Sequence, residues 1–254
     1  MTRLSPPTLY RCPACARYFT RSVLTFLHFY DDVPEWSDGK NEQWWAGIGG
    51  PAGRCPACLT VVWVETDTAL KREHWEPQAI SRWSRLWHLV TGDRTGRLRE
   101  EREWASLPRE MREAERLDSL NTAQDYIDAL AQIVPLVPER ERYLRRKLWW
   151  ASNDYLRRES GSPPLEADAA RTNMERLLDL LSSTADILER VELYRQLGRF
   201  QEALDLIASV PPDQQAKARL QQQWTEAGGS TMRVIPPLPI APLRRPRREM
   251  STDS

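Results

Sequence analysis

"YRCPACARYF", residues 10–19, places two cysteines two residues apart around a proline, with aromatic residues on both sides. "RCPACLTVVWV", residues 54–64, repeats the same CPAC core. Each Cys-x2-Cys turn brings two thiolates within reach of one ion, so two such turns complete the tetrahedral set of a structural zinc site. The sequence therefore predicts one structural Zn²⁺ ion, held by Cys12, Cys15, Cys55 and Cys58.

The residues around the cysteines indicate turns and short strands. Pro13 and Pro56 pre-set the two turns, and strand-like residues follow each cysteine pair. Four thiolates leave no coordination position for a water or a substrate, so the metal is expected to hold the fold and to do no chemistry. Ala16 and Leu59 stand where such knuckles often have glycine, and iron in a rubredoxin-like site would use the same ligands. Iron therefore stays an alternative to zinc.

The 39 residues between the two cysteine pairs form an insertion rich in tryptophan. Within "VPEWSDGKNEQWW", residues 33–45, Asp38-Gly39 predicts a tight hairpin turn. The tryptophans either pack against the rest of the chain or present an aromatic contact surface to a partner. Under the second interpretation, the candidate contact residues of the insertion are Trp36, Asp38, Lys40 and Trp44.

Residues 76–229 are rich in Arg, Glu, Leu, Ala and Gln, and their apolar residues recur with helical spacing. Helices are predicted around 80–90, 107–117, 120–134, 138–155, 174–181, 187–198, 200–210 and 214–224. The predicted fold class is α+β, mainly α: a small four-cysteine zinc ribbon with an inserted β-hairpin, followed by a helical-hairpin array. The predicted domains are the ribbon at 1–75, the helical domain at 76–229, and a disordered Pro/Arg-rich tail at 230–254.

One pair of predicted helices carries a repeat signature. In "LYRQLGRFQEALDLI", residues 193–207, Tyr194, Gly198, Phe200 and Ala203 resemble the helix–turn–helix core of a tetratricopeptide repeat. Glycine permits the turn, the aromatic residues fill the groove between the helices, and alanine allows close approach. Ordinary packing of a helical hairpin would use the same residues, so both interpretations stay open.

Composition and charge argue against several functions. The 254 residues carry 36 Lys+Arg and 36 Asp+Glu, a formal net charge of zero, and no apolar run approaches the length of a membrane span. A nucleic-acid binder is expected to show a positive footprint. The segment 1–70 instead has 6 basic and 7 acidic residues. With no signal-peptide core at the N-terminus, we expect a cytoplasmic protein without membrane contact.

No catalytic constellation is recognisable. The three histidines, His28, His74 and His88, belong to no known metal or nucleophile motif, so we expect that the protein is not an enzyme. Arg145 and Arg146, beside two tryptophans, form the best remaining candidate for a contact patch.

Taken together, the paired CPxC knuckles, the Trp-Ser-Asp-Gly-Lys turn at 36–40 and the stretch 193–207 resemble bacterial zinc-ribbon proteins with tetratricopeptide-like helices. This resemblance implies zinc and a helical scaffold, and no reaction. The leading hypothesis is a zinc-binding, non-catalytic scaffold or adaptor that binds another protein. The alternative is a nucleic-acid-binding zinc-ribbon protein, which the charge does not favour.

Overall fold

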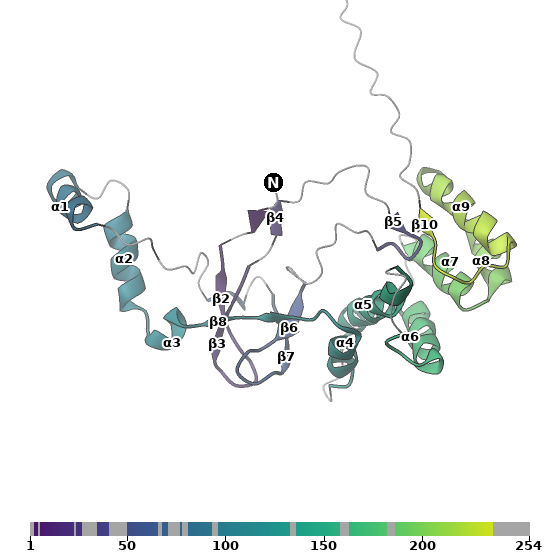
Figure 1. Ribbon diagram of the computed structural model, residues 1–254, viewed down its shortest axis with the longest axis horizontal. Helices are drawn as coiled ribbons and strands as arrows, with labels where there is room; N and C mark the ends of the chain where they lie inside the picture. Colours follow the sequence, from purple (N-terminus) through teal and green to yellow (C-terminus); the bar gives the residue numbers. More distant parts are fainter. Residues whose placement is uncertain are drawn as a thin grey trace, which may run out of the picture. The chain divides into compact units, whose positions relative to one another are not determined.

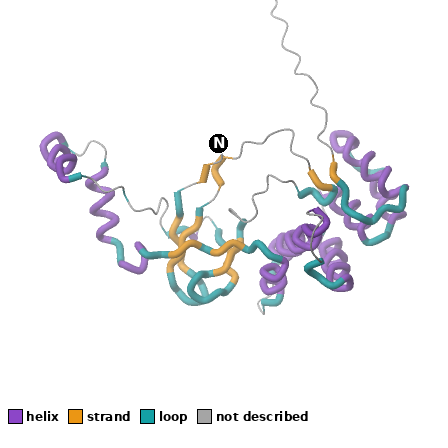
Figure 2. Tube along the Cα trace, in the orientation of Figure 1, coloured by secondary structure: helices purple, strands orange, loops and turns teal. Residues whose placement is uncertain are grey.

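The computed structural model of the chain describes residues 3–4, 6–22, 24–26, 35–40, 50–65, 68–70, 77, 81–92, 96–132, 136–157, 163–181 and 186–235 (Figure 1). The chain is mainly helical with small sheets, which confirms the predicted class at that level (Figure 2). Its internal contacts gather into two units. Met1–His28 and Trp45–Ile133 form the first, and Phe29–Trp44 and Val134–Ser254 form the second. The domain boundary predicted at residue 75 stays a prediction, and neither unit ends there.

The first unit, called here the ribbon unit, contains most of the strands. Its elements are β1 (Arg3–Leu4), β2 (Thr8–Arg11), β3 (Tyr18–Arg21), β4 (Leu24–Phe26), β6 (Ala52–Arg54), β7 (Val61–Trp63), α1 (Arg82–Thr91), α2 (Arg97–Ser106), α3 (Arg109–Arg112), β8 (Glu115–Arg116), β9 (Asp118–Ser119) and α4 (Ala123–Leu130). Strands β1 and β4 form a separate antiparallel pair. Each cysteine knuckle lies in the turn of a hairpin, the first between β2 and β3 and the second between β6 and β7.

A single short segment adds a third strand to both knuckle hairpins. In the first hairpin β2 and β3 are antiparallel, and β8 pairs in parallel with β3. In the second hairpin β6 and β7 are antiparallel, and β9 pairs antiparallel with β6. Strands β8 and β9 are separated only by Leu117, so residues 115–119, called here the bridging segment, belong to both sheets (Figure 1).

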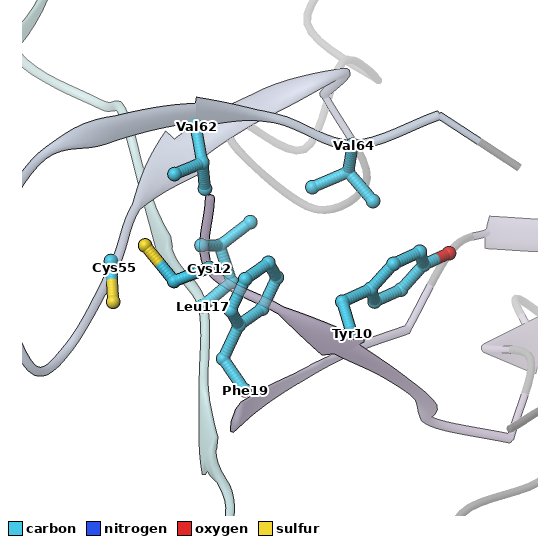
Figure 3. Close-up of a cluster of buried hydrophobic side chains, with 7 residues drawn as sticks. All are labelled: Tyr10, Cys12, Phe19, Cys55, Val62, Val64 and Leu117. Carbon is cyan, nitrogen blue, oxygen red and sulfur yellow. The ribbon is translucent and has the colours of Figure 1, made fainter. Parts of the chain in front are cut away.

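The core of the ribbon unit lies between these sheets. Tyr10 and Phe19 face each other across the first hairpin, with their rings stacked at 5.7 Å between centroids. Leu117 joins them from the bridging segment, as Figure 3 shows. The complete buried cluster is Tyr10, Cys12, Phe19, Cys55, Val62, Val64 and Leu117. Two of the four cysteines are therefore part of the apolar core.

The helix predicted over residues 107–117 is wrong beyond its first turn. Helix α3 ends at Arg112, and the backbone then extends as the bridging segment. The amide of Leu117 donates to the carbonyl oxygen of Thr20 at 2.8 Å. The apolar spacing of 107–117 fits a helix, but pairing with two strand edges and burial of Leu117 outweigh that local preference.

The second unit, called here the helical unit, contains the longest helices. Its elements are β5 (Glu35–Trp36), α5 (Pro138–Arg157), α6 (Ala167–Leu180), α7 (Ile187–Gln196), α8 (Phe200–Ile207), the short 3₁₀ helix η3 (Pro212–Gln214), α9 (Gln215–Glu226) and β10 (Val234–Ile235). The five helices predicted between residues 138 and 224 are confirmed, with ends shifted by up to three residues in four of them, whereas α6 begins seven residues before the predicted start at residue 174. Among the described helices of the whole chain, none has the length and apolar character to cross a membrane.

Two apolar clusters hold these helices together. Helices α5, α6 and α7 share buried Trp149, Leu177 and Leu193. The indole nitrogen of Trp149 donates to the side-chain oxygen of Gln196 at 2.9 Å, so its polar atom is satisfied inside the core. Helices α7, α8 and α9 share a second cluster in which Ala203 and Ala218 are fully buried. The small alanine side chains allow these helices to approach closely.

The tryptophan-rich insertion contributes its described turn to the helical unit. The turn predicted at Asp38-Gly39 is present, because the amide of Gly39 donates to the carbonyl oxygen of Trp36 at 2.8 Å and Gly39 has φ of 78°. Strand β5, however, pairs with β10 from near the C-terminal end of the chain, with Trp36 opposite Val234. Residues 230–235, predicted as the start of a disordered tail, are therefore ordered. Residues 236–254 lie outside the described residues.

Gly53 provides a direct test of the bridging segment. A Cβ atom at Gly53 would lie 2.6 Å from the carbonyl oxygen of Asp118 and 2.6 Å from Cγ of Leu117. Strand β6 and the bridging segment cannot move apart to make room for it without breaking their strand pairing. We expect Gly53→Ala to lower the free energy of unfolding by about 1–3 kcal/mol, measured by urea denaturation.

The control is Gly229→Ala, because a Cβ atom there would meet only the carbonyl oxygen of Trp224, at 3.5 Å. This variant is expected to change stability by less than about 0.5 kcal/mol. Equal effects of the two substitutions would contradict the close approach of residues 117–118 to Gly53.

Candidate metal centre

The two knuckles are built by the same hydrogen bonds. In the first, the amide of Cys12 donates to the carbonyl oxygen of Arg17 at 2.8 Å, and the amide of Ala16 donates to that of Cys12 at 2.9 Å. In the second, Cys55 donates to Thr60 at 3.0 Å, and Leu59 donates to Cys55 at 2.8 Å. The repeated CPAC sequence therefore folds into two turns of one kind, each held by its own backbone.

Both turns require a left-handed residue directly after the second cysteine. Ala16 has φ of 60° and Leu59 has φ of 61°, and these are the only described residues other than glycine with positive φ. An L-residue with a side chain is disfavoured there by roughly 1–2 kcal/mol. This is the position at which such knuckles often have glycine, so both turns form in spite of local strain.

The four sulfur atoms converge on one point. Every pair of Sγ atoms lies within 4.8 Å, and the Cys12–Cys58 and Cys15–Cys55 pairs are each 3.8 Å apart. A tetrahedron of thiolates around a metal at about 2.3 Å has edges of about 3.8 Å. The predicted set of four cysteines is therefore brought together with the spacing of a tetrahedral site, and it could hold a metal ion.

Electrostatics at the sulfur atoms favours a bound cation. Burial raises the pKa of the Cys12 thiol, and it raises the pKa of Cys55 to about 12. Hydrogen bonds with Thr60 lower the pKa of Cys58 to about 6, and the bond to the Thr60 side chain has a larger effect than the bond to its backbone. Thiolates buried as deeply as Cys12 and Cys55 need a compensating positive charge, which a divalent ion among four sulfurs would supply.

The two pairs of sulfur atoms differ in their surroundings. Cys12 and Cys55 are buried in the apolar core (Figure 3), whereas Cys15 and Cys58 are half-buried. The inner cysteines thus link the site to the core of the ribbon unit. The outer ones close the tetrahedron from the side of solvent.

The candidate contact residues of the insertion are engaged inside the helical unit. The carboxylate of Asp38 is fully buried, where it forms an ion pair with Arg157 and accepts a hydrogen bond from Asn153 at 3.0 Å. Lys40 pairs with Asp154 at 2.5 Å. Trp36 lies half-buried, with its ring 5.8 Å from the Arg157 guanidinium. Trp44 lies outside the described residues.

Arg145 and Arg146 are likewise paired with acidic side chains. Nε of Arg145 donates to Glu141 at 2.8 Å, and Nε of Arg146 donates to Glu189 at 2.6 Å. The indole nitrogen of neighbouring Trp150 donates to the backbone oxygen of Asp38 at 2.9 Å. The structure thus joins the two groups of candidate residues, which the sequence presents more than 100 positions apart, within one unit. Their role in binding a partner stays a prediction.

Sequence reasoning missed the most deeply buried charges. Arg195 and Glu192 form an ion pair whose side chains are both 0% exposed. The spacing of three residues in a helix is common for pairs on a solvated surface, so it gave no signal of burial. The bridging role of Leu117 was also missed, because the apolar spacing of residues 107–117 predicted a helix there.

Comparison with known protein families, with curated proteins and with solved structures finds no match for this chain. What the residues themselves support is a mainly helical chain with a four-cysteine site able to hold a metal ion.

The strained position of the second knuckle can be tested by substitution. Leu59 is 62% exposed, so Leu59→Gly removes little packing while it relieves the left-handed strain. After the entropy of the more flexible unfolded chain is subtracted, we expect a gain of about 0.5–1 kcal/mol in the free energy of unfolding, measured by urea denaturation.

The matched control is Ala57→Gly in the same turn, because Ala57 is exposed and has no positive φ. It is expected to destabilise the protein by about 0.4–1 kcal/mol. If Leu59→Gly destabilised the protein as much as Ala57→Gly does, the left-handed strain at Leu59 would be refuted.

Proposed function

We propose that this chain is a zinc-binding, non-catalytic protein-interaction protein. In this proposal a four-cysteine zinc ribbon holds the ribbon unit, and a tetratricopeptide-like helical region serves as the scaffold. The observation that carries it is the closed set of four sulfur atoms, two of them in the apolar core. Such a set uses all four positions of a tetrahedral ion, as structural zinc sites do.

The helical hairpin of α7 and α8 supports the scaffold part of the proposal. Gly198 has φ of 75° in the turn between the two helices, and Ala203 is fully buried where the helices meet. Tyr194 packs against the shared cluster, and its ring lies 4.7 Å from the guanidinium of Arg199. These are the places that the residues of a tetratricopeptide-like hairpin would take.

An exposed apolar face on α1 supports an interaction role. The exposed fractions are 83% for Trp83, 55% for Leu86, 68% for Trp87 and 83% for Val90. These four residues follow the spacing i, i+3, i+4 and i+7, so they share one side of the helix. Contiguous exposed apolar surface of this kind is typical of contacts with other proteins.

Charge distribution gives less support to the nucleic-acid alternative. Arg54 pairs with Asp125 and Asp128, and Arg109 pairs with Glu113. Guanidinium groups already neutralised by carboxylates gain less from phosphate. Binding of nucleic acid would still be recognised by a steep loss of affinity with added salt.

The metal is tested first. The full chain, purified from cells supplied with zinc and iron, is expected to contain one zinc ion per chain by elemental mass spectrometry. Cys58→Ser should lose most of it, because three thiolates bind zinc far less tightly than four. Ala57→Ser, in the same turn, should keep it. Stoichiometric iron would replace zinc in the proposal, and metal-free protein would overturn it.

The interaction role is tested with the exposed face of α1. The tagged chain and its Trp83→Ser and Val137→Ser variants are each used to retain proteins from the host lysate. Each experiment is done with and without nuclease. Val137 is an exposed apolar residue of the other unit, 50% exposed, and serves as control. We expect one discrete protein to survive nuclease and to be kept by Val137→Ser, with its affinity reduced about tenfold or more by Trp83→Ser.

Two outcomes of that experiment would contradict the proposal. Loss of all retained material after nuclease treatment, with steep salt dependence, would favour nucleic-acid binding. Equal retention by the wild type and Trp83→Ser would exclude the α1 face as the contact.

A further inference from the structure

Helix α1 has no described side chain that is buried. The helix runs from Arg82 to Thr91, and the hydroxyl of Ser81 caps it by accepting from the amide of Ser84 at 3.2 Å (Figure 1). A helix of this length is only marginally stable in water without tertiary packing. A surface that covers its apolar side would therefore stabilise it. That side, called here the α1 face, is formed by Trp83, Leu86, Trp87 and Val90.

The α1 face is directed away from α2, the next helix of the chain. Arg85 lies two positions from both Trp83 and Trp87, and two residues turn about 200° around a helix. The guanidinium of Arg85 pairs with Glu101 of α2 at 2.8 Å. Helix α2 thus contacts the side of α1 opposite the α1 face, and it leaves that face open.

The area of the α1 face matches half of a small dimer interface. Trp83 and Val90 are each 83% exposed, Trp87 is 68% exposed, and Leu86 is 55% exposed. Because one large aromatic side chain can bury about 150–250 Å², the four side chains together present roughly 600 Å². Two copies of the face would remove roughly 1,200 Å² from water, which is the lower end of the range for stable, specific interfaces. A second copy of this chain therefore supplies sufficient area.

The width of the α1 face suits contact with one other helix. The spacing i, i+3, i+4 and i+7 confines the four side chains to a stripe about 100° wide. Trp83 and Val90 are one heptad apart, with Leu86 and Trp87 between them, and a heptad is the repeat of helices that pack side by side. The face therefore favours a helix as its partner.

The stripe is also symmetric about its own centre. Trp83 and Val90 are equally far along the helix from the midpoint between Leu86 and Trp87. In a two-fold interface the same patch is used on both subunits. With the two helices antiparallel about an axis through this midpoint, Trp83 faces Val90 of the partner subunit. Leu86 then faces Trp87 of the partner subunit.

The antiparallel arrangement is favoured over the parallel one. When the helices are antiparallel, each indole meets a smaller aliphatic side chain, and such alternation lets two surfaces interdigitate. In a parallel pair the indoles would instead meet each other. The two helix dipoles are also opposed in the antiparallel pair, whereas they would be aligned in the parallel one.

We propose that two copies of this chain form an antiparallel dimer through the α1 face. This inference rests on the proposed role of that face in protein contact, and it names the partner that covers it. The discrete protein retained from a host lysate is then the untagged copy of this same chain. Two helical units are thereby joined in one assembly.

The first test is the mass of the full-length, metal-loaded chain, measured by analytical ultracentrifugation over a range of concentrations. We expect a reversible equilibrium between one and two chains with a dissociation constant in the micromolar range, because the interface is small. Trp87→Ser removes the same contact twice in a two-fold pair. A tenfold loss for each contact then raises the dissociation constant about a hundredfold. The control is Leu70→Ser, an exposed apolar residue of the ribbon unit outside α1, which is expected to dimerise as the wild type does.

The direction of the two helices is tested with a pair of charges. Leu86→Glu and Trp87→Lys each place a charge in an apolar interface, so each variant alone is expected to be monomeric. Mixed in equal amounts, the two variants are expected to form a dimer. In the antiparallel pair the introduced carboxylate faces the introduced ammonium group, and the other half of the interface keeps its native contact between Leu86 and Trp87. Such recovery also shows that both variants are folded.

Several results would overturn the proposal. A single chain at every concentration would exclude the dimer, and a dimer unaffected by Trp87→Ser would place the interface elsewhere. Monomers in the mixture of Leu86→Glu and Trp87→Lys would exclude the antiparallel pairing. If a monomeric chain retains a different protein through Trp83, this inference fails and the proposed function stands. Metal-free protein that still dimerises would overturn only the proposed function.

Discussion

Both knuckle hairpins depend on the bridging segment, which supplies a third strand to each of them. A two-stranded hairpin is at best marginally stable alone, and β6 and β7 have only three residues each. Strand β8 extends the first hairpin and β9 extends the second, so five consecutive residues join two hairpins whose cysteine pairs are separated by 39 residues in the sequence. Because the bridging segment pairs with both hairpins, it fixes the position of one cysteine pair relative to the other.

The metal site and the bridging segment act on the same two hairpins. Leu117 packs in one cluster with Cys12 and Cys55, so a residue about 60 positions beyond the second knuckle closes the core behind the sulfurs. Ion binding would link the hairpins through their turns, while Leu117 links them through their interiors. Each link would reduce the loss of chain entropy that forming the other requires, so binding of an ion would be cooperative with folding of this unit.

In the helical unit, segments distant in the sequence are held together by a buried ion pair. Arg195 is fully buried, and its guanidinium bonds to Glu192, to the backbone oxygen of Gly229 at 2.5 Å and to that of Thr231 at 2.7 Å. Ser37 donates to Glu192 at 2.7 Å from the insertion. A buried ion pair is tolerated only when its remaining donors and acceptors are satisfied. The turn of the insertion and the segment before β10 therefore close around charges on α7.

The parts of this architecture that could be predicted are those with local causes. Two CPAC turns bring their thiolates together by their own backbone hydrogen bonds, and Pro138 and Gly198 mark helix ends by their backbone preferences. The parts that could not be predicted depend on partners distant in the chain. Ser37 and Glu192 are 155 positions apart, and nothing in the sequence near either residue indicates the other.

Two segments show why the local sequence pattern is insufficient to predict the unit to which a segment belongs. Residues 35–40 lie between the knuckles in sequence but pack with the helices, and residues 115–119 lie among helices in sequence but pair with the ribbon strands. In each case the decisive energy is the satisfaction of groups that other segments bury: Glu192 and Arg195 need Ser37 and its neighbours, and the edges of β3 and β6 need a strand. A chain that exchanges segments in this way has units whose boundaries cannot follow changes of composition.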